Sequence, residues 1–419
     1  MGNVDTVVIG AGQAGLAISY YLCEQHREHV VLERGRIGES WLSQRWDSFR
    51  LNTPNFMSAL PGLPYDGPQR DAFASADELA RYFQRYAEKF QLPVETGVTV
   101  VSVKPVENGE GFVIETQANG QAREPLVSRS VVIASGVQQA PRIPALSQRI
   151  PAGVMQMHTS SYRNPQSLPP GAVVIVGSGQ SGGQVAEELL GAGRMVYLCT
   201  SKVPRVPRRY RGRDILEWWV DMGFLDVTYD SLEDKAISRS PQPQTSGLGR
   251  YGHTVSVQGL ARQGAVILGR LLDVNGNTLT LGDDAAMHVH FADGFSQQMR
   301  DRIEAYIVKA GISAPPAEED AADTPDLQAA CVSPLRELNL QEAKISTVIW
   351  ATGFIEDFSW IHLPIQDTEG KLVHQHGISP VGGLYFLGFP WLHSRKSGIV
   401  YGVGEDAQYI AEAIAAQPA

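Results

Sequence analysis

"GSGQSG" at residues 177–182 follows an apolar strand and opens an amphipathic helix, within the longer stretch "AVVIVGSGQSGGQVAEELLGAG" at 172–193. The same pattern stands near the start of the chain, in "TVVIGAGQAGLAISYYL" at 6–22. In each copy the first glycine permits a tight turn, the second lets backbone amides approach a pyrophosphate, and the third lets the helix pack closely on the strand. The glycines are Gly10, Gly12 and Gly15 in the first copy and Gly177, Gly179 and Gly182 in the second. The sequence therefore predicts two dinucleotide-binding turns, called here the first and second cradles.

The context of the first cradle strengthens this interpretation. The next strand, "HVVLERG" (29–35), ends on Glu33, about 20 residues beyond the glycines, where an acid binds a ribose hydroxyl in such folds. The alternative is a generic strand–turn–helix with a solvated Glu33. The candidate cofactor-binding residues of this cradle are Gly10, Gly12, Gln13, Ala14, Gly15, Glu33 and Arg34.

Bulk composition limits the class of protein. A length of 419 residues favours two or three domains, and 43% hydrophobic with 19% charged residues is typical of a soluble globular chain. No apolar run approaches the roughly 20 residues that span a bilayer, and the N-terminus enters a strand without an export signal, so a cytoplasmic location is expected. Three scattered cysteines disfavour a disulfide framework, a metal site and a redox dithiol. The net charge of −10 argues against nucleic-acid binding.

Further apolar runs that end in glycine predict the domain order. They are "VVIASGV" (131–137), "VIWATGF" (348–354) and "GLYFLGF" (383–389), followed by a glycine-rich turn and helix at 397–414. We expect this C-terminal segment to return to the first domain, so that the second cradle belongs to an inserted domain. The predicted fold is α/β, with two Rossmann-like domains of the three-layer ββα type. The predicted boundaries are 1–165 and 341–419 for the first domain and 166–340 for the second.

The remaining segments give weaker patterns. Residues 76–92 predict an amphipathic helix, and residues 294–311 predict another. Residues 238–254 are expected to form a long polar loop, and the acidic, Pro/Ala-rich residues 312–327 an exposed linker. Loops of this length are usually functional or mobile, so we expect them near the substrate entrance.

Seven motifs in order carry a family resemblance. They are "GAGQAG", "GESW" (38–41), "LNTP" (51–54), "HTSSYRNP" (158–165), "GSGQSG", "ATGF" (351–354) and "FLGFP" (386–390). Over nearly its whole length the chain resembles the flavin-containing monooxygenases, class B flavoproteins with two dinucleotide-binding domains. The resemblance implies that the first cradle binds FAD and the second binds NADPH. It adds Ser40, Trp41, Thr352 and Gly353 to the candidate cofactor-binding residues.

The resemblance also implies an activity. Members use NAD(P)H to form a C4a-(hydro)peroxyflavin with O2 and oxygenate a small molecule, here a soft nucleophile at sulfur or nitrogen. Asn52 in "LNTP" is the candidate catalytic residue, facing flavin and nicotinamide; the alternative is a turn asparagine. Other functions stay open: Baeyer–Villiger oxygenation of a ketone, an NAD(P)H oxidase or reductase without oxygenation, or a nucleotide-binding redox sensor.

The family's linker motif is only partly present. Val154 stands where the family has glycine, and Tyr162 where a tryptophan can stand, which favours heteroatom over Baeyer–Villiger oxygenation. For His158 we expect a structural role between the domains rather than catalysis. A homodimer is left open.

The second cradle indicates which nicotinamide cofactor is used. Gln180 and Ser181 are expected to cap its helix and contact the pyrophosphate. The next strand, 194–200, ends without the acid that would bind the 2′-hydroxyl of NAD. Thr200, Ser201 and Lys202 follow, and then five arginines between 205 and 213, among which Arg208 is the candidate for the 2′-phosphate. The prediction is NADPH, with NADH also accepted; the alternative is a basic loop that is solvated or tied to acidic neighbours.

Overall fold

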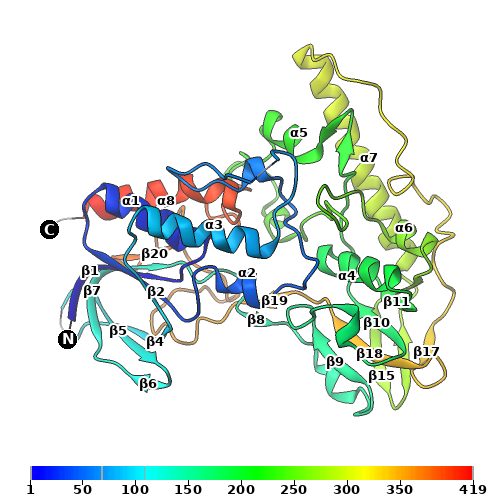
Figure 1. The fold of residues 1–419 in the computed structure, drawn as a ribbon, viewed down its shortest axis with the longest axis horizontal. Helices are drawn as coiled ribbons and strands as arrows, with labels where there is room; N and C mark the ends of the chain where they lie inside the picture. The colour runs from blue at the N-terminus through cyan, green and yellow to red at the C-terminus, as the bar shows by residue number, and fades with distance from the viewer. Residues whose placement is uncertain (1, 68, 108, 418–419) are drawn as a thin grey trace.

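The computed structural model describes residues 2–67, 69–107 and 109–417, and it contains two α/β domains (Figure 1). In Figure 1 the N-terminal (blue) and C-terminal (red) parts of the chain form one lobe, and the middle of the chain forms the other. The predicted fold, with one Rossmann-like domain inserted into another, is confirmed.

The first domain is built on a mixed sheet. Its strands β3, β2, β1, β7 and β20 run parallel, and β5 and β4 continue the sheet as an antiparallel meander. The order is β3 (Val94–Thr96), β2 (His29–Glu33), β1 (Gly2–Ile9), β7 (Leu126–Ile133), β5 (Phe112–Ala118) and β4 (Val98–Pro105), with β20 (Leu384–Phe386) beside β7 and β6 (Gln121–Ala122) beside β5.

Helices from both ends of the chain cover this sheet. These are α1 (Gln13–Glu24), α3 (Ala76–Lys89) and α8 (Val400–Ala415), and the short α2 (Glu39–Ser43) packs against α3. Helix α3 starts at Ser75, whose side chain and that of Glu78 form a reciprocal capping box, and it buries the apolar face predicted from its periodicity. Because α8 packs against α1 and β20 pairs with β7, the C-terminal segment does return to the first domain (Figure 1).

The second domain has a parallel five-stranded sheet. Its order is β14 (Val266–Leu268), β11 (Val196–Cys199), β10 (Ala172–Val176), β18 (Ile345–Trp350) and β9 (Met155–His158). The predicted boundaries at 165 and 340 do not follow this pairing, because β9 and β18 lie outside 166–340 and yet belong to the second sheet. Pairing between parallel strands is long-range and is not encoded in either segment alone. We propose boundaries close to residues 150 and 353.

The two connections between the domains lie side by side. Strand β8 (Ala140–Pro141) leads out of the first domain and β19 (Phe354–Ile355) leads back, and the two pair antiparallel, with Phe354 opposite Pro141. Their pairing joins the domains through one two-stranded ribbon.

The second domain carries its helices and small sheets away from this ribbon. The helices are α4 (Gln180–Gly191), α5 (Ile215–Asp221), α6 (Val257–Arg262) and α7 (Ala285–Ala310). The small sheets are β12 (Arg209–Tyr210) with β13 (Arg213–Asp214), and β15 (Leu271–Asn275), β16 (Thr278–Leu281) and β17 (Glu337–Asn339). Single 3₁₀ turns lie at Asn55–Met57, Ala145–Arg149, Pro165–Ser167 and Lys235–Arg239.

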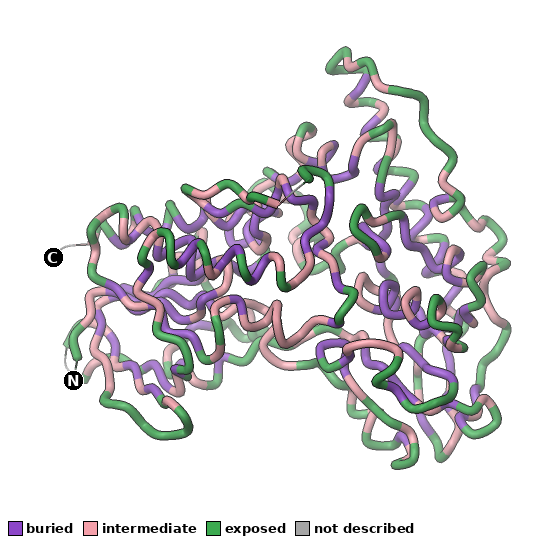
Figure 2. Tube along the Cα trace, viewed as in Figure 1, coloured by how far each residue is buried: buried purple, intermediate pink, exposed green. Residues whose placement is uncertain are grey.

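Three segments refine the sequence expectations. Helix α7 begins nine residues before the predicted start at 294, and its first turns are anchored by the buried His288, whose Nδ1 lies 3.0 Å from Thr200 Oγ1. The 312–327 segment is mostly exposed along the outer edge of the domain (Figure 2), but Asp323 is buried in a cluster with Arg205 and Asp293. The 238–254 loop is not polar surface throughout, because residues 244–247 are buried. Among the described residues, no helix is both long and apolar enough to cross a membrane.

Candidate active site

A cavity of about 680 Å³ opens between the first cradle and the second domain. Both domains contribute to its wall, since Gln180 and Ser181 at the start of α4 line it together with the first cradle. The other lining residues are Gly10, Gly12, Gln13, Ala14, Glu33, Arg34, Glu39, Ser40, Trp41, Ser43, Gln44, Arg45, Trp46, Phe49, Leu51, Asn52, Thr53, Ala134 to Gln138, Thr159, Ser160, Phe354, Gly388 and Gly398 to Val400.

The three glycines of the first cradle have different surroundings. A Cβ on Gly10, where φ is +109°, would lie 2.6 Å from the carbonyl oxygen of Ala134. A Cβ on Gly15 would lie 1.8 Å from the carbonyl oxygen of Gly10, whereas a Cβ on Gly12 would meet nothing within 4 Å. Gly12 also stands at the start of α1, which has no side-chain cap. The outer glycines thus permit close packing, and the middle one leaves uncapped amides open to a phosphate.

The second cradle repeats this arrangement position by position. A Cβ on Gly177 would lie 2.5 Å from Ala351 O, one on Gly182 would lie 2.0 Å from Gly177 O, and one on Gly179 would meet nothing within 4 Å. Helix α4 also starts without a side-chain cap. The donor set in both cradles therefore fits a dinucleotide.

Glu33 lies beside the first cradle, as its spacing predicted. Its Oε2 accepts from the Ala11 amide at 2.8 Å, and its Oε1 accepts from the Gly35 amide at 2.8 Å. The carboxylate is 8% exposed and lines the cavity, and the next residue, Arg34, is exposed at the same wall. Glu33 therefore fixes the loop between β1 and α1 while keeping a face toward the cavity.

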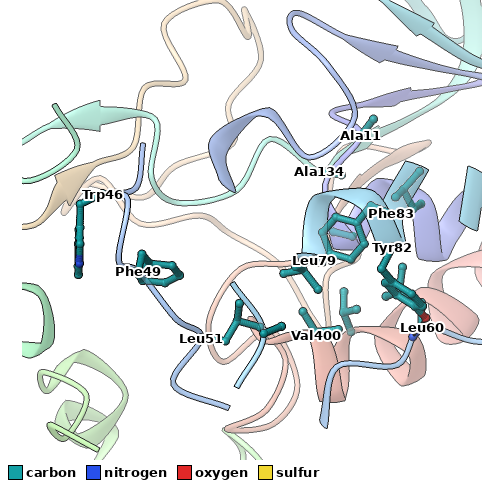
Figure 3. Close-up of a cluster of buried hydrophobic side chains, with 14 of the residues drawn as sticks. Ala11, Trp46, Phe49, Leu51, Leu60, Leu79, Tyr82, Phe83, Ala134 and Val400 are labelled. Carbon is teal, nitrogen blue, oxygen red and sulfur yellow. Dashed lines mark hydrogen bonds between the residues drawn. The ribbon is translucent and has the colours of Figure 1, made fainter. Parts of the chain in front are cut away.

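An aromatic segment after β2 forms one side of the cavity. Trp41 Nε1 donates to Gln13 Oε1 at 3.4 Å, and the guanidinium carbon of Arg45 lies 4.9 Å from the centroid of the Trp41 ring. Arg45 also donates to Gln138 Oε1 at 2.6 Å, and burial lowers its pKa to about 10. Figure 3 shows Trp46 and Phe49 following each other along this segment, with their rings at an edge-on angle. The segment encloses the cavity with rings and one cation.

Asn52 lies in the cavity wall and contacts the second domain. Its Oδ1 accepts from Gln184 Nε2 at 3.3 Å, and its main-chain oxygen accepts from Arg208 Nη1 at 2.9 Å. Asn52 is therefore a residue of the first domain that is held by two side chains of the second.

The prediction that Arg208 binds the 2′-phosphate does not match its position. Arg208 is 1% exposed, donates from Nε to Asp214 Oδ2 at 2.8 Å and lies against the ring of Phe73. Its cationic head is already paired inside the protein, so it is not available to a cofactor. Of the two alternatives stated for the basic loop, the tie to acidic neighbours is the one observed here.

The other candidate residues after β11 also differ in whether their polar groups are already bonded within the protein. Thr200 is buried and its Oγ1 donates to Leu268 O at 2.8 Å, so this hydroxyl is used within the domain, contrary to the prediction. The Ser201 amide donates to Ser178 Oγ at 3.0 Å, which fixes the end of β11 beside the second cradle. Lys202 is exposed, with Nζ 4.8 Å from the Phe291 ring centroid. Ser201 and Lys202 stay the candidates for the 2′-phosphate.

Thr352 and Gly353 are not among the residues that line the cavity, and their binding of a cofactor stays a prediction. Thr352 Oγ1 donates to Arg142 O, and Gly353 O accepts from the Arg142 amide at 2.9 Å, so both residues fix the ribbon between the domains. His158 Nε2 also lies 2.9 Å from Gly353 O, and its Nδ1 lies 2.9 Å from Ser160 Oγ. Burial lowers the pKa of His158, which keeps the imidazole neutral. These contacts tie His158 to the end of the ribbon, and the inter-domain role expected for it stays a prediction.

Several lining residues were not singled out from the sequence. Residues 135–138 and 159–160 follow the carboxyl ends of β7 and β9, where ligands bind in open α/β sheets. Gly388 and Gly398 to Val400 bring the C-terminal return into the wall. The strand-end rule, applied to the predicted run 131–137, could have found residues 135–138, whereas the strand before residues 159–160 was not predicted from the sequence.

Comparison with known proteins identifies the relatives of this site. Residues 7–223 match the family model described as pyridine nucleotide-disulphide oxidoreductase. The chain belongs to this family. The oxidoreductase CzcO of Bacillus subtilis (strain 168), described as uncharacterized, is 31% identical over 409 residues, which cover 97% of each chain. The chain is therefore an oxidoreductase.

Two solved structures share the fold over nearly all of both chains. A flavin-containing monooxygenase from Stenotrophomonas maltophilia has a TM-score of 0.64 at 19% identity, covering 99% of each chain. The bacillithiol disulfide reductase Bdr (YpdA) from Bacillus cereus has a TM-score of 0.63 at 15% identity, covering 99% of this chain and 100% of that chain. This fold therefore occurs both in a protein described as a monooxygenase and in one described as a reductase.

Proposed function

We propose that this protein is an NAD(P)H-dependent FAD monooxygenase that oxygenates a soft nucleophile, sulfur or nitrogen, in a small molecule. The observation that carries the proposal is that the starts of α1 and α4, one from each cradle, face a single cavity. Two nucleotides that meet in one enclosed space can exchange a hydride and keep water away from a reactive centre. None of the cysteines, Cys23, Cys199 and Cys331, which all lie in the described part of the chain, lines the cavity, and this favours oxygenation over thiol-based disulfide reduction.

The residues of the first cradle would hold FAD. The amides that follow Gly12 would bind the pyrophosphate, and Glu33 would accept from a ribose hydroxyl. When bound, FAD would provide the ring that accepts a hydride from the nicotinamide and, once reduced, reacts with O2. Trp41, Phe49 and Val400 exclude water from the cavity, because their side chains or backbone form its apolar wall. Asn52 presents an amide that donates and accepts without titrating.

Lys202 is expected to bind the 2′-phosphate of NADPH and so to distinguish NADPH from NADH. It is exposed, stands beside the second cradle, and forms no ion pair within the described residues. Lys202→Ala should raise the KM for NADPH about tenfold, the loss expected when one charge-assisted contact to phosphate is removed, and leave the KM for NADH within about twofold. Steady-state kinetics with both cofactors measure this. An equal change for both cofactors would contradict the assignment.

The function is tested with FAD-loaded protein, NADPH and ¹⁸O2. The expected reaction with methyl phenyl sulfide is sulfide + O2 + NADPH + H⁺ → sulfoxide + NADP⁺ + H2O. One oxygen atom goes to sulfur, the other leaves as water, and the two electrons come from the hydride. Mass spectrometry should find one ¹⁸O in the sulfoxide. A tertiary amine serves as the nitrogen probe.

Other outcomes select the alternatives. Ester or lactone formed from a ketone such as cyclohexanone, with no sulfoxide, would favour the Baeyer–Villiger reading. Hydrogen peroxide released in proportion to NADPH with every probe would favour an oxidase or reductase. NADPH binding without turnover would favour a redox sensor.

A further inference from the structure

The side chain of Asn52 is attached to the second cradle through Gln184. Gln184 lies on α4, one turn beyond Gln180, and it is 2% exposed. Its Nε2 donates to Asn52 Oδ1 at 3.3 Å and to the Ser246 carbonyl at 3.1 Å. This contact crosses from the inserted domain to the candidate catalytic residue of the first domain.

The orientation of both amide groups is dictated by the Ser246 carbonyl. A carbonyl oxygen can only accept, so the end of the Gln184 amide that faces Ser246 must be NH2. The same NH2 group faces Asn52, which must then present its oxygen. Gln184 Oε1 is buried without a partner among the described residues, so the site tolerates an unpaired acceptor in order to keep this orientation.

The Ser246 carbonyl is itself held in place. Gln180 Nε2 donates to Ser246 O at 2.5 Å, and Gln180 Oε1 accepts from the Thr245 amide at 2.8 Å. Arg208 donates both to Thr245 O at 3.3 Å and to Asn52 O at 2.9 Å. Residues 245–246 are thus fixed on α4 from one side and on the Asn52 backbone from the other.

We propose that Gln184 is a positioning residue that directs the amide NH2 of Asn52 away from the second domain and into the cavity. This inference rests on the proposed monooxygenase function. With Oδ1 occupied by Gln184, the two N–H groups of Asn52 are left to donate to the oxygen atom being transferred, where a fixed neutral donor stabilises developing negative charge. If this orientation is lost, NADPH should still be consumed, but less of the oxygen should reach the substrate.

Two substitutions change the orientation in different ways. Gln184→Leu removes the donor and leaves the Asn52 amide free to turn. Gln184→Glu has one O–H when protonated, which can donate to Asn52 Oδ1 in competition with the Ser246 carbonyl. When ionised it only accepts, and this would draw the NH2 of Asn52 away from the cavity. Gln408→Leu is the matched control, because Gln408 is exposed on α8 and, within the described part of the chain, its side chain bonds to Glu412 alone.

The pH dependence of Gln184→Glu follows from the groups around the site. Arg208, paired with Asp214, faces it from the chain before α5. Glu187, paired with His253, and Glu188, bonded to Tyr162 and Ser48, lie on the next turn of α4. Burial disfavours the ionised carboxyl and Arg208 favours it. The moles of sulfoxide formed per mole of NADPH consumed should therefore be higher at pH 5.5 than at pH 8.5 in Gln184→Glu. This ratio should change little with pH in wild type.

The test measures coupling, the moles of sulfoxide formed per mole of NADPH consumed, in the FAD-loaded protein. We expect Gln184→Leu to lower coupling at least threefold, with more hydrogen peroxide and a KM for NADPH within twofold of wild type. Gln184→Glu at pH 8.5 should behave in the same way. Gln408→Leu should match wild type.

A second readout does not depend on activity. The ¹⁵N side-chain amide signals of Asn52, assigned by their loss in Asn52→Ala, should shift with pH between 5.5 and 8.5 in Gln184→Glu and stay constant in wild type. If wild type forms sulfoxide and both Gln184 variants match it in coupling and amide shifts, the positioning inference is wrong. If wild type forms no oxygenated product, the proposed function fails first.

Discussion

Gly15→Ala is expected to lower the free energy of unfolding by about 3 kcal/mol or more, whereas Gly12→Ala should lower it by at most about 1 kcal/mol. The chemical change is the same in both. At Gly15 the new Cβ would lie 1.8 Å from the Gly10 carbonyl, so β1 and α1 must separate. At Gly12 it would meet no heavy atom within 4 Å.

Gly12→Ala should weaken FAD binding more than Gly15→Ala does, which is the reverse of their order in stability. The methyl group of Gly12→Ala enters the space left open for a phosphate, so its affinity for FAD should fall at least tenfold. Denaturant unfolding without FAD and fluorescence titration with FAD measure the two effects separately. Equal stability of both variants, or normal FAD affinity of Gly12→Ala, would contradict the assignment of one glycine to packing and the other to the ligand.

Arg208→Met is expected to destabilise the protein by about 3–5 kcal/mol, because it leaves Asp214 as a buried charge without its counter-ion. The carbonyls of Asn52 and Thr245 would lose a donor as well. Arg209→Met is the control, since the neighbouring Arg209 is exposed and, among the described residues, its side chain donates to the carbonyls of Tyr251 and Gly252 alone. It should cost less than about 1 kcal/mol.

Kinetics and a double variant separate this role from cofactor binding. The ratio of KM values for NADPH and NADH should not change in Arg208→Met, because the guanidinium is buried and paired with Asp214. Arg208→Met combined with Asp214→Leu should recover part of the lost stability, since no uncompensated charge is then buried. A selective loss of NADPH binding in Arg208→Met would instead support the prediction that Arg208 binds the 2′-phosphate.

The glycine cradles and Glu33 could be predicted from the sequence because their chemistry is local. A strand, a turn that needs glycine and a helix follow one another within a few residues, and the resulting backbone geometry recurs in both copies. Asn52 was reached through the resemblance to a family rather than through its own surroundings. Its partner Gln184 is 132 residues away in the chain, and no local pattern links the two.

The arginines show why charge runs are hard to interpret. Arg208 and the exposed Arg209 are adjacent, and nothing in their immediate neighbours marks one as buried. Whether an arginine is buried here depends on a tertiary contact, since Phe73 from the first domain covers Arg208. The domain boundaries depend in the same way on long-range contacts, since β18 was recognised as a strand but its partner β10 lies about 170 residues earlier.

The ribbon of β8 and β19 makes the second domain an exchangeable unit. The segments that lead into it and out of it are neighbours in space, because Phe354 and Ile355 pair with Pro141 and Ala140. A nucleotide domain with the same spacing between its ends can therefore replace the present one without moving the strands of the first domain. Evolution could alter the reductant and the side of the cavity that faces the second domain together, in one recombination, while the first cradle stayed intact.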